Sequence, residues 1–183
     1  MDTSRKTALA TDSRIDPQAE RFMEETVHHA QPCSAHALLA SWAGTWKVRT
    51  RNWMGSWVES TGTVKMRMTL GGRYLEETYT STVLGHSFEG RTVYGYDNAQ
   101  DVFVMMTYGS MGTGLTLREG TLDASGRVIT FRNATGGSER VVIRMEGPNA
   151  LVAEMFDGEP GPDEVRVVEA RYTRARSVWG LGT

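Results

Sequence analysis

From residue 44 onward, apolar and polar residues alternate with a period of two, which is typical of strands that bury one face. The stretch 46–51, WKVRTR, shows the pattern clearly. Short turn sequences such as Gly71-Gly72 and Asp97-Asn98 separate about ten such stretches. The expected strands cover residues 46–51, 62–70, 73–84, 87–96, 101–108, 115–122, 127–133, 140–146, 151–156 and 164–174.

The turns between these strands are too short to contain helical crossovers, and parallel pairing requires such crossovers. We therefore expect an antiparallel meander, which removes its exposed edges by closing into an up-and-down barrel. A β-sandwich is the structural alternative, but Greek-key sandwiches usually contain a longer connection than any found here. The predicted fold class is mainly β: an antiparallel barrel of about ten strands with short N-terminal helices.

One strand also predicts its own register. Val64, Met66 and Met68 alternate with Lys65 and Arg67. A slip of one residue would bury two cations and expose the apolar set, so the apolar residues should face inward.

Two short helices are expected before the first strand. Asp16 can cap a helix whose first residue is Pro17, and apolar residues then recur at helical spacing over residues 17–30. Pro32 ends this helix, and a second one is predicted for residues 34–43.

These elements predict one domain. Residues 1–15 are polar and without periodicity, so we expect a disordered tail there. A single domain is predicted for residues 16–183, with helices within 17–43 and the barrel over 44–175.

Composition excludes several functional classes. The net charge of −2 gives no general electrostatic reason to bind nucleic acid or an anionic membrane. No apolar stretch approaches the roughly 20 residues of a spanning helix, and the first 15 residues are too polar for a signal peptide. The single cysteine, Cys33, cannot form an internal disulfide, so a cytoplasmic location is expected. A homodimer remains an open alternative.

No metal or cofactor is predicted. The run HHAQPCSAH contains His28, His29, Cys33 and His36, but its spacing matches no common zinc pattern. Related ten-stranded haem barrels hold iron through a histidine late in the chain, and no histidine follows His86 here. Phosphate-binding loops, dinucleotide fingerprints and nucleophile elbows are also absent from the sequence.

Candidate site residues come from types that suit an adaptable apolar cavity with a few polar groups. The expected ligand-binding residues are Met66, Met68, Tyr94, Met106, Tyr108, Trp46 and His36.

Strand carboxylates are candidates for acid–base chemistry, because a buried glutamate with a raised pKa can act as a general acid or base. Glu76, Glu77, Glu119 and Glu169 all lie within predicted strands. Of these, Glu119 and Glu169 are the preferred catalytic candidates.

Barrel closure makes one further prediction. Trp46 opens the first strand, and Arg171 and Arg174 lie on the last strand, which closure places beside the first. We expect one of these guanidinium groups within about 6 Å of the indole ring.

Several short motifs occur in an order that resembles a bacterial, lipocalin-like family, domain of unknown function 1579. The segments are His36-x-x-Leu39-x-x-x-x-Gly44-x-Trp46, residues 70–76 (LGGRYLE), 88–91 (FEGR), 95–98 (GYDN), 110–114 (SMGTG) and 169–174 (EARYTR). The resemblance spans residues 34–175 and implies a barrel with helical lids, but no agreed activity. Members tend to have an aromatic pair and an acidic residue before SMGTG, where this chain has Thr107, Tyr108 and Gly109.

Two functions follow from this fold and these residues. The first is the binding of a small, mostly apolar molecule inside the barrel. The second is an enzyme of the isomerase, cyclase or hydratase type that acts on a metabolite held there.

Overall fold

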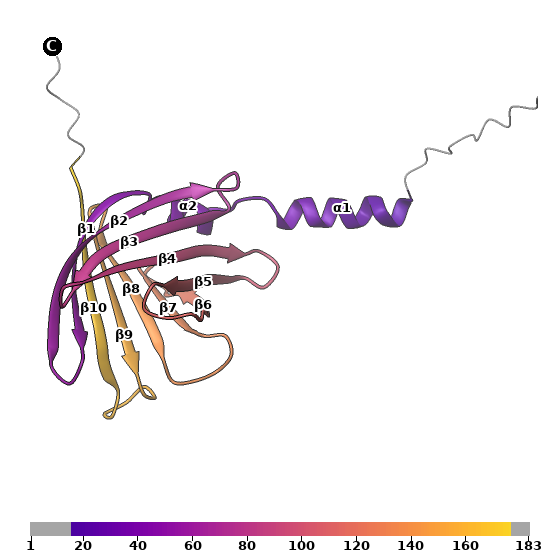
Figure 1. The fold of residues 1–183 in the computed structure, drawn as a ribbon. Coiled ribbons are helices and arrows are strands. Elements are labelled where there is room, and N and C mark those ends of the chain that lie inside the picture. The colour runs from indigo at the N-terminus through magenta and orange to yellow at the C-terminus, as the bar shows by residue number, and fades with distance from the viewer. Residues whose placement is uncertain (1–15, 177–183) are drawn as a thin grey trace, which may run out of the picture. The chain divides into compact units, whose positions relative to one another are not determined.

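A computed structural model describes residues 16–176, which form two short helices and ten strands (Figure 1). The predicted tail at residues 1–15 lies outside the described residues. The helices are α1, Pro17–His29, and α2, Ser34–Ala40. The strands are β1 Gly44–Trp53, β2 Trp57–Thr69, β3 Tyr74–Val83, β4 His86–Asp97, β5 Val102–Gly109, β6 Thr116–Leu122, β7 Val128–Asn133, β8 Arg140–Gly147, β9 Ala150–Asp157 and β10 Val165–Arg174.

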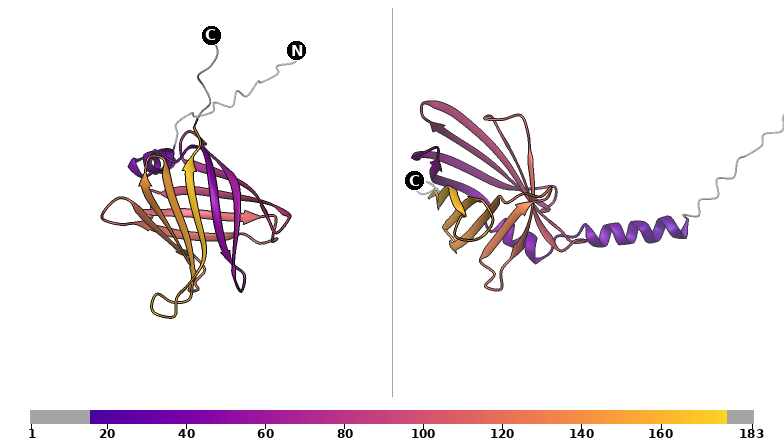
Figure 2. Two further views of the ribbon diagram at one scale, coloured as in Figure 1. Left: turned by 90° about the vertical axis from the view of Figure 1, so that its left-hand side faces the viewer. Right: turned by 90° about the horizontal axis from the view of Figure 1, so that it is seen from below.

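The strands close into a barrel in which each strand pairs antiparallel with its neighbours in sequence, and β1 also pairs with β10. The closing pair places Trp46 opposite Arg174 and Thr50 opposite Ala170. In Figure 2, β8–β10 run steeply across the direction of β3–β6. The predicted fold class, an antiparallel up-and-down barrel rather than a sandwich, is therefore confirmed.

The register predicted for β2 is also confirmed. Val64 and Met66 are buried, and Met68 is half-buried against the core. Lys65 and Arg67 are exposed. The alternation of β2 therefore sorts its apolar and charged side chains onto opposite faces of the barrel wall.

The helix α2 covers one end of the barrel, where it packs against β3 and β4. Leu39 of α2 is fully buried, and the following Trp42 and Trp46 are nearly so. The indole nitrogen of Trp46 donates a hydrogen bond to the carbonyl oxygen of Trp42, 2.9 Å away. Leu75 and Phe131 belong to the same apolar cluster, so this end is a packed core.

Arg174 of β10 binds the backbone of the segment between α2 and β1. Its guanidinium carbon lies 4.1 Å from the centroid of the Trp46 ring, as predicted for one of the two arginines. Its Nη1 donates to the carbonyl of Ala43 at 2.6 Å, and its Nη2 donates to that of Ser41 at 2.8 Å. Arg171 instead takes the other face of β10, where it pairs with Glu169.

Contacts divide the chain between Gln31 and Pro32, so α1 belongs to a separate unit from the barrel and α2. Within its own unit, α1 begins as predicted, because Oδ1 of Asp16 accepts a hydrogen bond from the backbone nitrogen of Gln18 at 2.8 Å. The single domain expected for residues 16–183 stays a prediction.

Candidate functional site

A cavity of about 400 Å³ extends into the barrel from the end away from α2. It lies where β3 and β5 end and where β4 and β6 begin, and the loop at residues 111–114 borders it. The opposite end of β4 holds Tyr96, whose ring meets that of His36 from α2 at 6.0 Å. The barrel thus has one packed end and one open end.

Five aromatic and three methionine side chains line the cavity. The rings of Tyr79 and Phe88 meet edge to face with centroids 5.5 Å apart. Tyr94 separates the cavity from the packed core, since its ring contacts both Trp42 and Phe131. The cavity lining also includes Tyr108, Tyr172, Met105 and Met155.

Glu77 places a carboxyl group in this apolar wall. It lies on β3 with the same parity as Leu75, which is fully buried, and its own side chain is only 6% exposed. The hydroxyl of Tyr94 donates a hydrogen bond to Oε2 of Glu77 at 3.2 Å. Burial raises the pKa of Glu77 to about 7, although the Tyr94 hydrogen bond acts in the opposite direction.

Two phenol groups share the electrostatic environment of Glu77. Burial raises the pKa of Tyr94 well above its ordinary value, and the charge of Glu77 raises it further. The same two causes raise the pKa of Tyr172 on β10. Both phenols therefore stay neutral. The Tyr94 hydroxyl donates its hydrogen to Glu77, whereas that of Tyr172 can donate into the cavity.

Arg118 adds a cation on β6, the strand next to β5. It is buried, and its Nη2 forms an ion pair with Glu139. Burial lowers the pKa of Arg118, while the nearby Tyr94 raises it. Among the described residues, the Nε atom of Arg118 has no hydrogen-bond partner although it is buried. A buried donor in this state costs free energy unless an acceptor reaches it.

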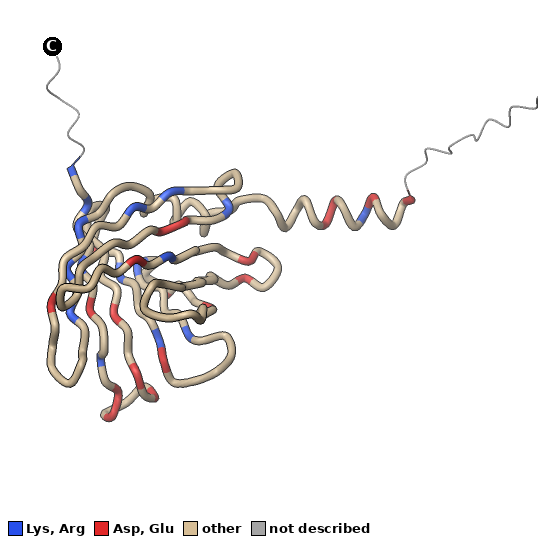
Figure 3. The backbone as a smooth tube through the Cα atoms, in the orientation of Figure 1, with Lys and Arg blue, Asp and Glu red and all other residues tan. Residues whose placement is uncertain are grey.

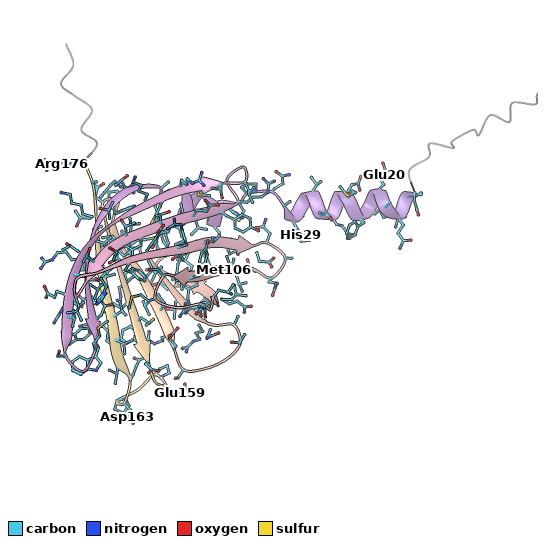
Figure 4. The ribbon with its side chains drawn as sticks, in the orientation of Figure 1. Glu20, His29, Met106, Glu159, Asp163 and Arg176 are labelled. Atoms are coloured by element: carbon cyan, nitrogen blue, oxygen red, sulfur yellow. The ribbon has the colours of Figure 1, made fainter. Side chains whose placement is uncertain are left out.

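The cavity contains only part of the predicted ligand-binding set. Tyr94 and Tyr108 line it. Met106, labelled on β5 in Figure 4, does not line it, whereas its neighbour Met105 does. Met105 has the parity of the buried Phe103 and points inward, so Met106 falls on the outer face.

The other four predicted residues lie at the packed end. Met66 and Trp46 belong to the buried core, and Met68 packs against it. His36 is buried in α2, where its Nδ1 accepts a hydrogen bond from the backbone nitrogen of Cys33 at 3.0 Å. Burial and the charge of Arg73 lower the pKa of His36, which leaves it a neutral packing residue. Over residues 16–176, no group of three His, Cys, Asp or Glu side chains could hold a metal ion.

Neither preferred catalytic carboxylate lines the cavity. Glu119 is exposed on β6, because its neighbours Arg118 and Gly120 take the inward positions. Glu169 is buried, but it lies 2.8 Å from nitrogens of both Arg166 and Arg171. Burial raises the pKa of Glu169, but these arginines outweigh it and the pKa is lowered. The buried carboxylate of the cavity is Glu77 instead.

Residues 31–174 match the family described as "Protein of unknown function (DUF1579)". The chain belongs to this family. All the cavity residues named above fall within the DUF1579 segment, whereas α1 lies outside it.

The fold of this DUF1579 chain is similar to the crystal structure of Rv2717c from M. tuberculosis. The match has a TM-score of 0.59 and 14% sequence identity, and it covers 80% of this chain and 100% of the other. At this identity, the likeness shows the fold alone. No curated protein matches the chain significantly. Within residues 16–176, neither helix is long and apolar enough to cross a membrane.

Proposed function

We propose that this protein binds a small, mostly apolar molecule in the cavity at the open end of the barrel. The cavity volume of about 400 Å³ is in the range of small-molecule sites. Its aromatic and methionine walls suit an apolar body, and its few polar groups would fix the orientation of the ligand. The single cysteine of the chain, Cys33, supports a cytoplasmic location.

One observation carries this proposal. The Nε atom of Arg118 is buried beside the cavity and has no acceptor among the described residues. Buried donors in native proteins almost always have a partner. A ligand that offers an acceptor from within the cavity would supply it, which gives the site both an apolar and a polar element of recognition.

Filling the cavity tests the proposal. Thr107 of β5 lines the cavity, so Thr107→Trp should occupy part of the ligand space. We expect the neutral fluorescent probe N-phenyl-1-naphthylamine to bind the wild-type protein and to lose at least about tenfold in affinity, roughly 1.4 kcal/mol, in this variant.

The matched control is Leu117→Trp, because Leu117 is 44% exposed on the outer face of β6. It adds the same side chain without entering the cavity and should leave the probe affinity unchanged. Far-UV circular dichroism checks that both variants are folded. Binding of the probe with equal affinity to both variants would contradict the proposal.

The second candidate function is an acid–base enzyme of the isomerase, cyclase or hydratase type. Glu77 favours it, because a cavity carboxyl with a pKa of about 7 is suited to take and return a proton at neutral pH. A proton taken from the carbon next to a substrate carbonyl and returned to another carbon needs no external oxidant or reductant. Glu77-dependent exchange of such protons with deuterated water would favour the enzyme, and an absence of exchange would favour binding alone.

A further inference from the structure

The charges around the cavity do not balance. Arg118 is neutralised by Glu139, and Arg91 at the rim pairs with Glu89. Glu77 forms no ion pair with any described residue. Its cross-strand partners are Met66 on β2 and Thr92 on β4, neither of which carries a charge.

The cations of the neighbouring strands do not reach this carboxyl. Lys and Arg are frequent on β1, β2 and β10, as Figure 3 shows. Lys47, Arg49 and Lys65 are exposed and alternate with inward residues, so they face away from the interior. The phenol of Tyr94 from β4 contacts Glu77, and Tyr172 from β10 and Tyr79 of its own strand line the same cavity. The cavity thus has a carboxyl group but no free counter-ion.

Aromatic rings around a carboxylate are the chemical environment that recognises organic ammonium ions. Ring faces attract a cation through their quadrupole, and the attraction grows when water is excluded. Tyr79, Tyr94 and Tyr172 supply the rings, and Glu77 supplies the opposite charge. An anionic ligand would bring a second negative charge into the cavity and would compete with Glu139 for Arg118.

We propose that the ligand is a small amphipathic organic ammonium ion whose nitrogen pairs with Glu77 between the tyrosines. This inference rests on the proposed binding function. The apolar body of the ligand occupies the methionine and aromatic wall, and an acceptor atom on it receives the hydrogen bond of Arg118 Nε. The ammonium ion supplies the partner that a buried carboxylate needs to stay ionised.

Three ligands with one skeleton test the charge preference. Isothermal titration calorimetry of the full-length protein at pH 7.5 would compare 3-phenylpropylamine, 3-phenylpropanol and 3-phenylpropanoate. We expect the amine to bind at least about tenfold more tightly than the alcohol, and the carboxylate to bind most weakly. Glu77→Gln should reduce the affinity for the amine to that for the alcohol.

The matched control is Glu76→Gln. Glu76 is the next residue on β3, where it pairs with Arg67 at 2.7 Å on the outer face, so its loss should leave all three affinities unchanged.

A second measurement does not depend on any variant. Because the ammonium ion requires an ionised Glu77, amine binding near pH 6.5 should release a proton, and the heat should then vary with the ionisation enthalpy of the buffer. The affinity for the amine should fall as the pH decreases from 8 to 5, whereas that for the alcohol should not.

The possible failures are distinguishable. Equal or tighter binding of the alcohol or the carboxylate, or amine binding without proton release, overturns the ammonium inference and leaves the binding function intact. The same holds if N-phenyl-1-naphthylamine binds and none of the three compounds does. Failure of the naphthylamine probe and of all three compounds to bind overturns the binding function itself.

Discussion

Glu77 holds an acidic group where water cannot stabilise its charge. The unfolded chain ionises this carboxyl near pH 4.5, whereas the folded protein retains its proton up to a pH of about 7. Its contribution to stability is therefore fully present below pH 4.5 and is lost as the pH rises through about 7. At about 1.4 kcal/mol per pKa unit, the contribution is about 3 kcal/mol.

Glu77→Gln should remove this pH dependence. We expect the variant to be more stable than the wild type by about 2–3 kcal/mol at pH 8, and the difference to disappear near pH 4.5. Urea unfolding at the two pH values measures it. Glu76→Gln, on the exposed side of β3, serves as the control and should show no such change. An equal effect of Glu77→Gln at both pH values would mean that Glu77 is not the titrating group.

The sequence alone predicted that a glutamate of a strand could face the cavity, but it did not identify Glu77 as that residue. Glu119 points outward, because Arg118 and Gly120, whose residue types do not mark a buried face, take the inward positions. The inward position 120 is a glycine because the Phe131 ring fills the space of a side chain: an added Cβ would lie 2.5 Å from the ring. Glu169 is buried, but Arg166 and Arg171 of the same strand pair with it, and no sequence pattern marks this arrangement.

At the scale of elements, β2 specifies its register through its inward side chains. Met66 is 5% exposed within the core, so Met66→Lys would bury an unpaired charge. We expect this variant to be destabilised by at least about 3 kcal/mol in urea unfolding. Lys65→Met, on the exposed face, should change the stability by less than about 0.5 kcal/mol. Met68→Lys should cost less than Met66→Lys, because Met68 is only half-buried and its ammonium group can reach water.

The boundaries of the elements show what the alternation could and could not predict. The strand expected at residues 62–70 begins earlier, at Trp57. The alternation did not reveal this start, because Ser60 is a polar residue that faces inward. Its hydroxyl lies 2.5 Å from that of Thr50 across β1, so a hydrogen bond satisfies it inside the wall. The helix expected at residues 34–43 ends at Ala40, and Arg174 binds the carbonyls that follow. Both deviations come from partners elsewhere in the chain.

At the scale of the whole molecule, barrel closure gives the two ends different roles. The meander and its closure were predictable, because short turns allow only antiparallel neighbours and a closed sheet has no edges. The division into a packed end and an open end was not. It arises because α2, Trp42 and Trp46 fill one end, whereas small residues such as Gly90 and Gly109 border the cavity at the other.

Substitutions at the packed end should therefore change stability, whereas substitutions at the open end should change ligand binding. Arg174→Ala removes three hydrogen bonds to backbone carbonyls and the contact with Trp46, so it should destabilise the barrel by about 2 kcal/mol. The affinity of the folded variant for N-phenyl-1-naphthylamine should stay that of the wild type. Thr107→Trp should show the reverse, with a weakened probe affinity and a smaller change in stability.

The double variant completes this test. Arg174 contacts Trp46 and the segment after α2, whereas Thr107 lines the cavity, so their effects on the free energy of unfolding should add to within about 0.5 kcal/mol. Urea unfolding and probe titration of both single variants and the double variant measure the two quantities. A loss of probe affinity in Arg174→Ala, or a clear departure from additivity, would show instead that α2 and the cavity are coupled through the core at Tyr94, whose ring contacts Trp42.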